Sequence, residues 1–502
     1  MTNVEAGGAT STKSWRNLLL AKLVYFFVFA ADASWEPFAA YFLSTRNIQT
    51  KTIGILLTMM TICNACAGQV LTAAADHYRA HRAVALSSFA AFVVFTCSMY
   101  FNHSLWWTAV VGVLAQCAWG PMLPMIDNVT VQLVQGTAED YSKQRLGGAI
   151  AWALFCFGDG WVMERRGPDA ILEVMFVAGV VAFALLWHYP FEKFAPPLPA
   201  ATADAAADAS AGAANGLFFL DALGRLLSSN LLVVPFLSII VCIGYLFGTI
   251  DGYLALWVVQ LGGTSQLVGA MYAVASIVEI PLFFYSDAVY QRVGVRVILF
   301  ISCAAYTVRV VSYSLLREPL MVLCVEPLHA LTIALFYGPC VTYVNDTLLA
   351  DLPDLKATGQ GSFFASFYLG RAIGYVVAGW LSDFGGMRFM FKTTLIAVAV
   401  LVALVFNFCA VEKMLSSCGK KAFKHARSYD DLVSMVETQP FTAETQPFTA
   451  QCINTDPDDG VIPVSWQRKR GRRNSEAGVV YGAISPAPDP EAVAQGPIST
   501  LG

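Results

Sequence analysis

Long apolar runs alternate with short polar segments over most of the chain. A helix that crosses a bilayer needs about 20 mostly apolar residues, and twelve runs approach or exceed this length. The runs Thr52–Ala75, Ala83–Phe101 and Ser104–Ile126 contain no charged residue. The runs are continuous instead of alternating, which favours helices over barrel strands. The predicted spans are 18–43, 52–75, 83–101, 104–132, 146–164, 171–190, 230–259, 267–286, 297–316, 319–347, 359–381 and 389–411.

Composition supports this pattern. Of the 502 residues, 57% are hydrophobic and 13% are charged, whereas a soluble domain carries about 25% charged residues. A chain with so few polar residues cannot cover a water-soluble globule of this size. The formal net charge of −4 gives no indication of nucleic-acid binding. The cysteines are scattered singly apart from Cys63 and Cys66, so we expect lipid-buried thiols and no metal or redox cofactor.

The chain repeats one order of features. In each half an acid within a span is followed by a glycine at the head of the next span, and then by an acid and two arginines. The order predicts an all-α integral membrane protein of two pseudo-symmetric six-helix bundles, which is a transporter architecture. The predicted parts are an N-terminal segment (1–17), a first bundle (18–190), a linker with a possible amphipathic helix (191–229), a second bundle (230–411) and a disordered tail (412–502).

Basic residues indicate the orientation of the spans. With the N-terminus inside, the N-terminal segment and the inner segments between spans together carry eleven Lys and Arg residues, and the outer loops carry seven. Cytoplasmic loops normally hold this excess. We therefore expect both termini in the cytoplasm, and we expect the plasma membrane in preference to an organelle.

Ten ionisable side chains fall well inside predicted spans, away from the span ends. A charge at the centre of a membrane helix costs at least about 2.5–3.5 kcal/mol, so such residues are usually functional. They can form a substrate and proton pathway, or ion pairs that only fix helix packing. Spacings of four and three residues place two pairs on shared helix faces: Asp32 with Glu36, and Glu326 with His329. The ten residues are Asp32, Glu36, Asp127, Asp159, Asp251, Glu279, Arg309, Glu326, His329 and Arg371.

Two further charge groups lie at predicted inner ends of spans. Asp76 is followed by Arg79, and Asp287 by Arg292. These pairs can latch a cytoplasmic gate, or they can anchor the helix ends at the membrane surface with a partner acid.

One stretch carries a family resemblance. PMLPMIDNVTVQLVQGTAEDYSKQRLGGAIAWAL, from Pro121 to Leu154, resembles the branch of the major facilitator superfamily that contains the bacterial lactose permease and the oligosaccharide and nucleoside proton symporters. The resemblance implies that Asp127, Arg145 and Trp152 form a sugar-type site, with Asp in place of the permease's Glu. The chemistry agrees, because carboxylate and guanidinium bind hydroxyls and an indole covers an apolar ring face.

The second half resembles the eukaryotic major-facilitator associated-domain proteins most closely, through AYTVRVVSYSLL, VEPLHALTIALFYGP and FYLGRAIGYVVAGWLSDFGG. The resemblance covers about residues 16–411. It implies proton coupling through Arg309 and His329, but Thr332 stands where the permease has its coupling Glu, and Glu326 stands where it has a Lys. The proton can therefore be carried by Glu326 from the other side of His329, by another intramembrane acid (Asp32, Glu36 or Asp251), or not at all in a uniporter.

These features together predict a secondary active transporter, a monomer that moves a small polar solute of sugar or nucleoside type with protons by alternating access. A transporter-like receptor or scaffold that moves no solute is the alternative. No nucleotide-binding sequence or catalytic triad spacing is evident, so we expect neither a pump nor an enzyme.

Overall fold

The computed structural model describes residues 5–135, 141–191, 223–227, 230–349 and 356–425, and these residues are helical apart from short connections. Most of the predicted linker, the tandem ETQPFTA at 437–450 and the rest of the tail beyond 425 lie outside the described residues. Helices run further than predicted at both chain ends. α1 begins at Glu5, and α15 continues to His425. An ion pair between Arg296 of α11 and Glu412 of α15 fixes the part of α15 that follows the last predicted span.

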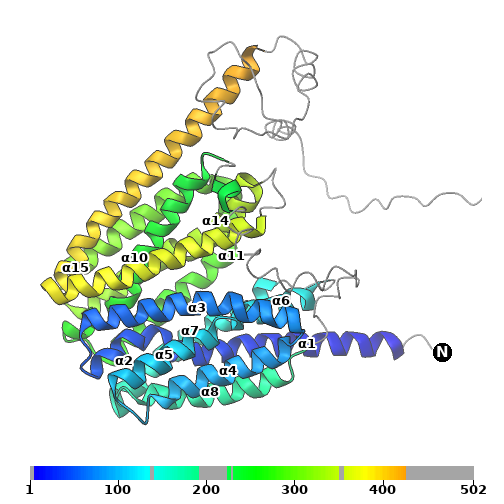
Figure 1. Ribbon diagram of the computed structural model, residues 1–502, viewed down its shortest axis with the longest axis vertical. Coiled ribbons are helices and arrows are strands. Elements are labelled where there is room, and N and C mark those ends of the chain that lie inside the picture. Colours follow the sequence, from blue (N-terminus) through cyan, green and yellow to red (C-terminus); the bar gives the residue numbers. More distant parts are fainter. Residues whose placement is uncertain (1–4, 136–140, 192–222, 228–229, 350–355, 426–502) are drawn as a thin grey trace, which may run out of the picture. The chain divides into compact units, whose positions relative to one another are not determined.

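The first half consists of helices in hairpin order (Figure 1). Two of its spans are interrupted, one before Pro37 and one at Pro121. Proline has no N–H to donate and clashes with the preceding turn, so each helix stops and restarts there. The elements are α1 Glu5–Ala33, η1 Glu36–Phe38, α2 Ala39–Thr45, α3 Thr50–Tyr78, α4 His81–Ser98, α5 Leu105–Trp119, α6 Met122–Val134, α7 Tyr141–Arg166 and α8 Ala170–Trp187.

The second half contains two helices that are too long for one crossing. α11 and α15 have 51 and 70 residues, and each leaves helical geometry at one glycine, Gly294 (φ +77°) and Gly386 (φ +80°). Glycine adopts positive φ without steric cost, so these positions turn the chain between two spans. The elements are α10 Val233–Gln260, α11 Ser265–Leu315, η5 Pro319–Met321, α12 Val322–Val325, η6 Glu326–Leu328, α13 His329–Thr332, α14 Ala334–Tyr343, η7 Val344–Leu348 and α15 Lys356–His425.

Eleven described helical stretches are long and apolar enough to cross a membrane. The last, Thr358–Leu415, has 58 residues and contains the turn at Gly386. At 1.5 Å per residue a straight helix of this length would extend roughly 87 Å, far more than one bilayer. It therefore supplies two crossings, which gives the twelve that the apolar runs predict.

Large apolar side chains are exposed along these helices. Trp106, Val177 and Ile396 are examples, at 81%, 64% and 68% exposure. Water would make such surfaces unfavourable, whereas lipid tails solvate them. The chain is thus a multi-pass integral membrane protein.

The two halves touch near one end of their helices. We call this the far end: it carries the connections 46–49, 99–104, 167–169, 261–264 and 316–318. There Gly160 of α7 packs on Gly269 of α11, and a Cβ on Gly160 would lie 2.6 Å from the Ser265 carbonyl oxygen. A second contact between the halves is made by the Tyr253 hydroxyl of α10, which lies 3.3 Å from the Thr50 carbonyl of α3. The same hydroxyl donates to the Tyr375 carbonyl of α15 at 2.9 Å.

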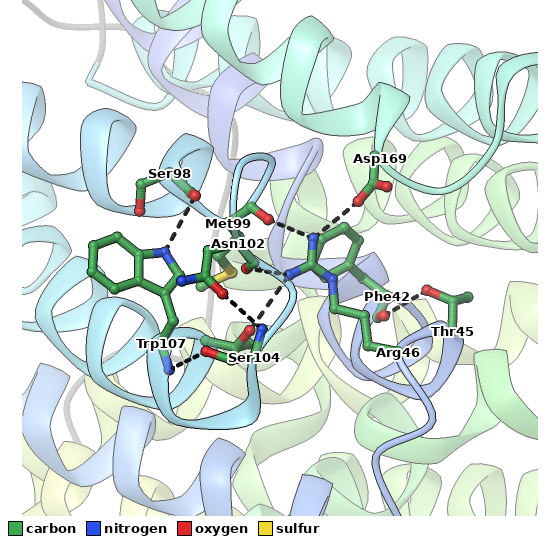
Figure 2. A network of polar contacts seen from close by, with 10 residues as sticks. Phe42, Thr45, Arg46, Ser98, Met99, Asn102, Ser104, Trp107 and Asp169 are labelled. Carbon is green, nitrogen blue, oxygen red and sulfur yellow. Dashed lines mark hydrogen bonds and ion pairs between the residues drawn. The ribbon is translucent and has the colours of Figure 1, made fainter.

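An arginine network fixes the far end of the first half (Figure 2). Arg46 follows α2, and its guanidinium lies over the Phe42 ring at 4.3 Å. It donates to the Met99 carbonyl at 2.6 Å, to Asp169 Oδ1 at 3.0 Å and to the Asn102 carbonyl at 3.2 Å. One buried side chain therefore ties together three connections that are far apart in sequence.

We expect Arg46→Ala to lower the free energy of unfolding by about 3 kcal/mol, because it leaves Asp169 and two carbonyls without their charged donor. The matched control is Arg166→Ala, which breaks an exposed 2.8 Å pair with Glu173 and should cost less than about 1 kcal/mol. Denaturant unfolding in mixed micelles measures both, and equal losses would contradict the assigned role of Arg46.

Candidate functional site

Arg371 connects the two halves of the protein. Its guanidinium, on α15, forms an ion pair with Glu36 of the first half, and its Nη2 lies 3.3 Å from Asp251 Oδ2 of α10. Its Nε donates to the Tyr375 hydroxyl at 2.8 Å. The cation also lies 5.2 Å from the centre of the Phe247 ring. Side chains from η1 in the first half and from α10 and α15 in the second half thus meet at the Arg371 guanidinium. We call Glu36, Asp251 and Arg371, together with Asp32, the central charge cluster.

Local sequence explains how Glu36 reaches this cluster. Pro37 ends the regular helix, and Glu36 sits in the short 3₁₀ turn that follows. Asp32 lies one turn earlier, at the end of α1, and only 6% of it is exposed. The cluster therefore holds three carboxyl groups and one guanidinium. Three carboxylates so close together would repel one another, and one guanidinium cannot neutralise them all. Protonation of one carboxyl group is therefore favoured, and the cluster can bind a proton.

A second cluster forms within the first half from two predicted site residues. Arg145 Nη1 of α7 lies 3.6 Å from Asp127 Oδ2 of α6. The Tyr25 hydroxyl donates to Asp127 Oδ1 at 2.5 Å, and Arg145 Nη1 is 3.1 Å from the Tyr141 hydroxyl. The side chains of Arg145 and Asp127 are 46% and 27% exposed, so a solute can reach both. The pair offers donors and an acceptor that suit hydroxyl groups.

Trp152, the third predicted member of that site, lies two turns further along α7 than Arg145. Residues seven apart share a helix face, but the described contacts do not join Trp152 to the ion pair. Its ring packs edge to face against Phe29 of α1, with centroids 6.2 Å apart. The structure thus brings Asp127 and Arg145 together and leaves Trp152 as a flanking aromatic surface.

A third cluster is almost completely buried in the second half. Arg309 Nη2 and Glu326 Oε2 are 3.5 Å apart, and each side chain is 3% exposed. Arg309 also donates to the Tyr313 hydroxyl and to Thr332 Oγ1, both at 3.0 Å. Tyr313 in turn donates to Glu326 Oε1 at 2.5 Å. Thr332, which stands in the position of the permease's coupling Glu, therefore accepts a hydrogen bond from Arg309.

His329 faces a different acid from the one that the sequence spacing suggests. Glu326 points to Arg309, because Pro327 places Glu326 at the start of a 3₁₀ turn and not in a continuous α-helix. His329 Nε2 instead lies 3.1 Å from Glu279 Oε1 of α11, close enough for an ion pair although the angles do not suit a hydrogen bond. Spans eight and ten are thus joined by a pair that sequence spacing does not predict.

Removing one partner of a buried ion pair leaves an uncompensated charge. We therefore expect Glu326→Ala to lower the free energy of unfolding by about 3–5 kcal/mol. The double variant Arg309→Met with Glu326→Leu removes both charges and should lose much less. Thermal unfolding in detergent compares them. A double variant that is less stable than Glu326→Ala would contradict the assignment.

The four predicted gate residues lie at helix ends. Asp76 pairs with His81, with Oδ1 and Nε2 2.7 Å apart. Arg79 adopts a left-handed conformation (φ +53°) that ends α3. Arg292 is exposed on α11, and the side chain of Asp287 lies outside the described residues. The structure therefore places His81 beside Asp76 at the first of these positions, and the second pair lies partly outside the described residues.

Sequence reasoning missed the tyrosines of these clusters. Each of the three arginines contacts a tyrosine four residues away on its own helix: Tyr141 with Arg145, Tyr313 with Arg309, and Tyr375 with Arg371. Residues four apart lie on one helix face, so this repeated spacing was visible in the sequence.

Known proteins are similar to this chain in sequence and in fold. Residues 18–393 match the MFS_1 like family. The maltose permease of Geobacillus stearothermophilus is 23% identical over 296 residues, which are 58% of this chain and 70% of the permease.

Solved transporter structures superpose on most of the chain. A nucleoside transporter, NupG, matches with a TM-score of 0.62 and 17% identity, over 79% of this chain and 99% of that chain. A bacterial homologue of the human drug peptide transporters PepT1 and PepT2 matches with a TM-score of 0.59 and 12% identity, over 80% and 99%. The family match covers well over half of the sequence. The chain therefore belongs to the MFS_1 like family, with the major facilitator fold, and is a secondary transporter of small molecules and not an enzyme.

Proposed function

We propose that this transporter moves a small polar organic solute of sugar or nucleoside type, coupled to protons, by alternating access. The observation that carries the proposal is the partly exposed Asp127–Arg145 pair, which has Tyr25 and Tyr141 beside it. A maltose permease and a nucleoside transporter among the similar proteins support this solute class.

The chemistry of the pair suits a solute with several hydroxyl groups. A carboxylate accepts hydrogen bonds from hydroxyls, and a guanidinium donates two in a fixed fork. Trp152, on the same face of α7, offers an apolar surface for a sugar ring or a base. We assign solute binding to Asp127, Arg145 and Trp152.

The central charge cluster supports proton coupling. Its three carboxyl groups face one guanidinium, so protonation of one acid changes the number of ion pairs between the halves. We assign the proton pathway to Asp32, Glu36 and Asp251, with Arg309, Glu326 and His329 as its continuation in the second half. A change of ion pairing between two bundles is a direct way to link proton binding to their relative movement.

The remaining assignments are also proposals. The protein acts as a monomer in the plasma membrane, does not bind nucleic acid, and has both termini in the cytoplasm, next to a gate formed by Asp76, Arg79, Asp287 and Arg292. The second-half motifs support a further proposal, that the chain is related to the eukaryotic associated-domain proteins.

Uptake into proteoliposomes tests the function. Labelled uridine and labelled maltose are offered separately, with and without an inward proton gradient, and protein-free vesicles serve as the control. We expect one of the two solutes to accumulate, with initial rates roughly tenfold higher under the gradient, the equivalent of about 1.4 kcal/mol. Uptake of equal rate with and without the gradient would identify a uniporter and remove the coupling claim.

A further inference from the structure

Asp159 is a buried acid without a cationic partner among the described residues. It lies on α7, and only 1% of it is exposed. Neither carboxyl oxygen has a well-aligned hydrogen bond among the described residues. Among these residues, the Ser34 hydroxyl is the one hydrogen-bond donor beside the carboxyl group, and it also donates to the Ala30 carbonyl at 3.1 Å. Neither the predicted solute site nor the central charge cluster includes Asp159.

The residue after Asp159 lies in a close contact between the two halves. Gly160 packs on Gly269 of α11, and a Cβ on Gly160 would come within 2.9 Å of the Gly269 Cα. Next to this contact, the Ser265 backbone N–H donates to Glu164 Oε2 at 2.8 Å, and the Ser265 hydroxyl lies 2.9 Å from that of Tyr41. Asp159 is therefore buried on α7 directly beside, in sequence, the packing that joins the halves at the far end.

This environment tolerates a carboxylic acid but not a carboxylate. An ionised carboxylate that is buried without a cation, and beside a single shared hydroxyl, loses more in hydration than it regains. A protonated carboxyl group loses far less. The packed far end thus selects the protonated form. Separation of α7 and α11 would admit water and permit ionisation.

We propose that Asp159 is a proton-binding site linked to closure of the far end: one proton from the adjoining water binds its carboxylate as α7 and α11 pack together, and it is released when they separate. The inference rests on the alternating-access function proposed above, because it requires a far end that opens. It adds a proton site that is separate from the central charge cluster.

Other titratable groups surround this site. Cys156 and Glu164 belong to the same helix, Tyr41 comes from α2, and the facing residues of α11, Ser265 and Gly269, are not titratable. The Cys156 thiol also lies within electrostatic range of the central acids. A pH profile of the native protein would therefore reflect the titration of several groups. Replacement of Asp159 is needed to identify its own contribution. The central acids within this range are Asp32, Glu36 and Asp251.

The test measures the distance across the far end in the full chain. Spin-labelled unnatural amino acids replace His103 and Glu318, two exposed residues in far-end connections of opposite halves. Pulsed electron paramagnetic resonance in lipid nanodiscs gives the populations of short and long distances at pH 5 and pH 8. The variants are Asp159→Asn and Asp159→Ala, so that the result does not depend on the folding of one of them. Glu173→Gln, which alters an exposed ion pair on α8, is the control.

We expect the native protein to favour the short distance at low pH, with a population ratio that changes by up to about tenfold per pH unit for one linked proton. Both Asp159 variants should keep the short distance at both pH values, and Glu173→Gln should behave like the native protein. Two outcomes would overturn the inference and leave the proposed function standing. In one, the Asp159 variants keep the native pH response; in the other, the native protein has two distance populations whose ratio does not change with pH. A single distance in every sample, with and without uridine or maltose, would remove the proposed function and this inference with it.

Discussion

Arg371→Ala is expected to abolish solute uptake, with a loss of at least about a hundredfold in initial rate. The substitution removes the only guanidinium described between Glu36 and Asp251, and leaves acids from opposite halves facing each other without a cation. Repulsion between them would favour separation of the halves at this level and would trap one conformation. Uptake into proteoliposomes, corrected for the amount of reconstituted protein, measures the effect.

Two variants separate charge from folding in this prediction. Arg371→Lys keeps the cation but loses the planar fork that reaches two acids and Tyr375, so we expect intermediate uptake. Lys392→Ala removes an exposed cation of the same helix, α15, and should leave uptake unchanged. Native rates for Arg371→Ala would show that the central charge cluster only fixes packing.

Arg145→Ala should weaken solute binding by about 10–150-fold, because a hydrogen bond to a charged group contributes roughly 1.5–3 kcal/mol. Asp127 would keep Tyr25 as a partner, so the fold should survive. Asp127→Asn, which keeps the size of the side chain, should weaken binding by a similar factor. Equilibrium binding of the transported solute to purified protein measures this loss apart from transport.

The control for the solute site is Arg165→Ala. Arg165 lies on the same helix as Arg145, but its guanidinium is 4.3 Å from the Trp161 ring near the far end of α7. Its removal should leave the dissociation constant unchanged. If Arg165→Ala and Arg145→Ala weaken binding equally, the effect comes from general destabilisation of α7 and not from contact with the solute.

Hydrophobic patterning predicted the spans well. The runs 52–75 and 83–101 correspond to α3, Thr50–Tyr78, and α4, His81–Ser98. This agreement has a physical cause, because a lipid-facing helix needs a continuous apolar length that is visible in the sequence. Prolines explain where helices are interrupted, but the sequence did not predict that the break before Pro37 would turn Glu36 towards the other half.

The partners of the intramembrane charges could not be predicted in the same way. Helical spacing suggested that Glu326 and His329 act together, yet the turn at Pro327 directs Glu326 to Arg309, and His329 meets Glu279. These pairings depend on the rotation of each helix against its neighbours, which local sequence does not determine. By contrast, Asp127 and Arg145 do meet, as the resemblance to the sugar and nucleoside symporters implies.

The central claim is that the chain carries a solute across the membrane through the site at Asp127 and Arg145. Counterflow tests it most directly, because vesicles preloaded with unlabelled solute exchange it for labelled solute without any gradient of protons. With the solute found by the uptake experiment, we predict a transient accumulation of label with the native protein and with Arg165→Ala, and a strongly reduced one with Arg145→Ala. Binding of the solute without any counterflow would contradict the account and indicate a receptor.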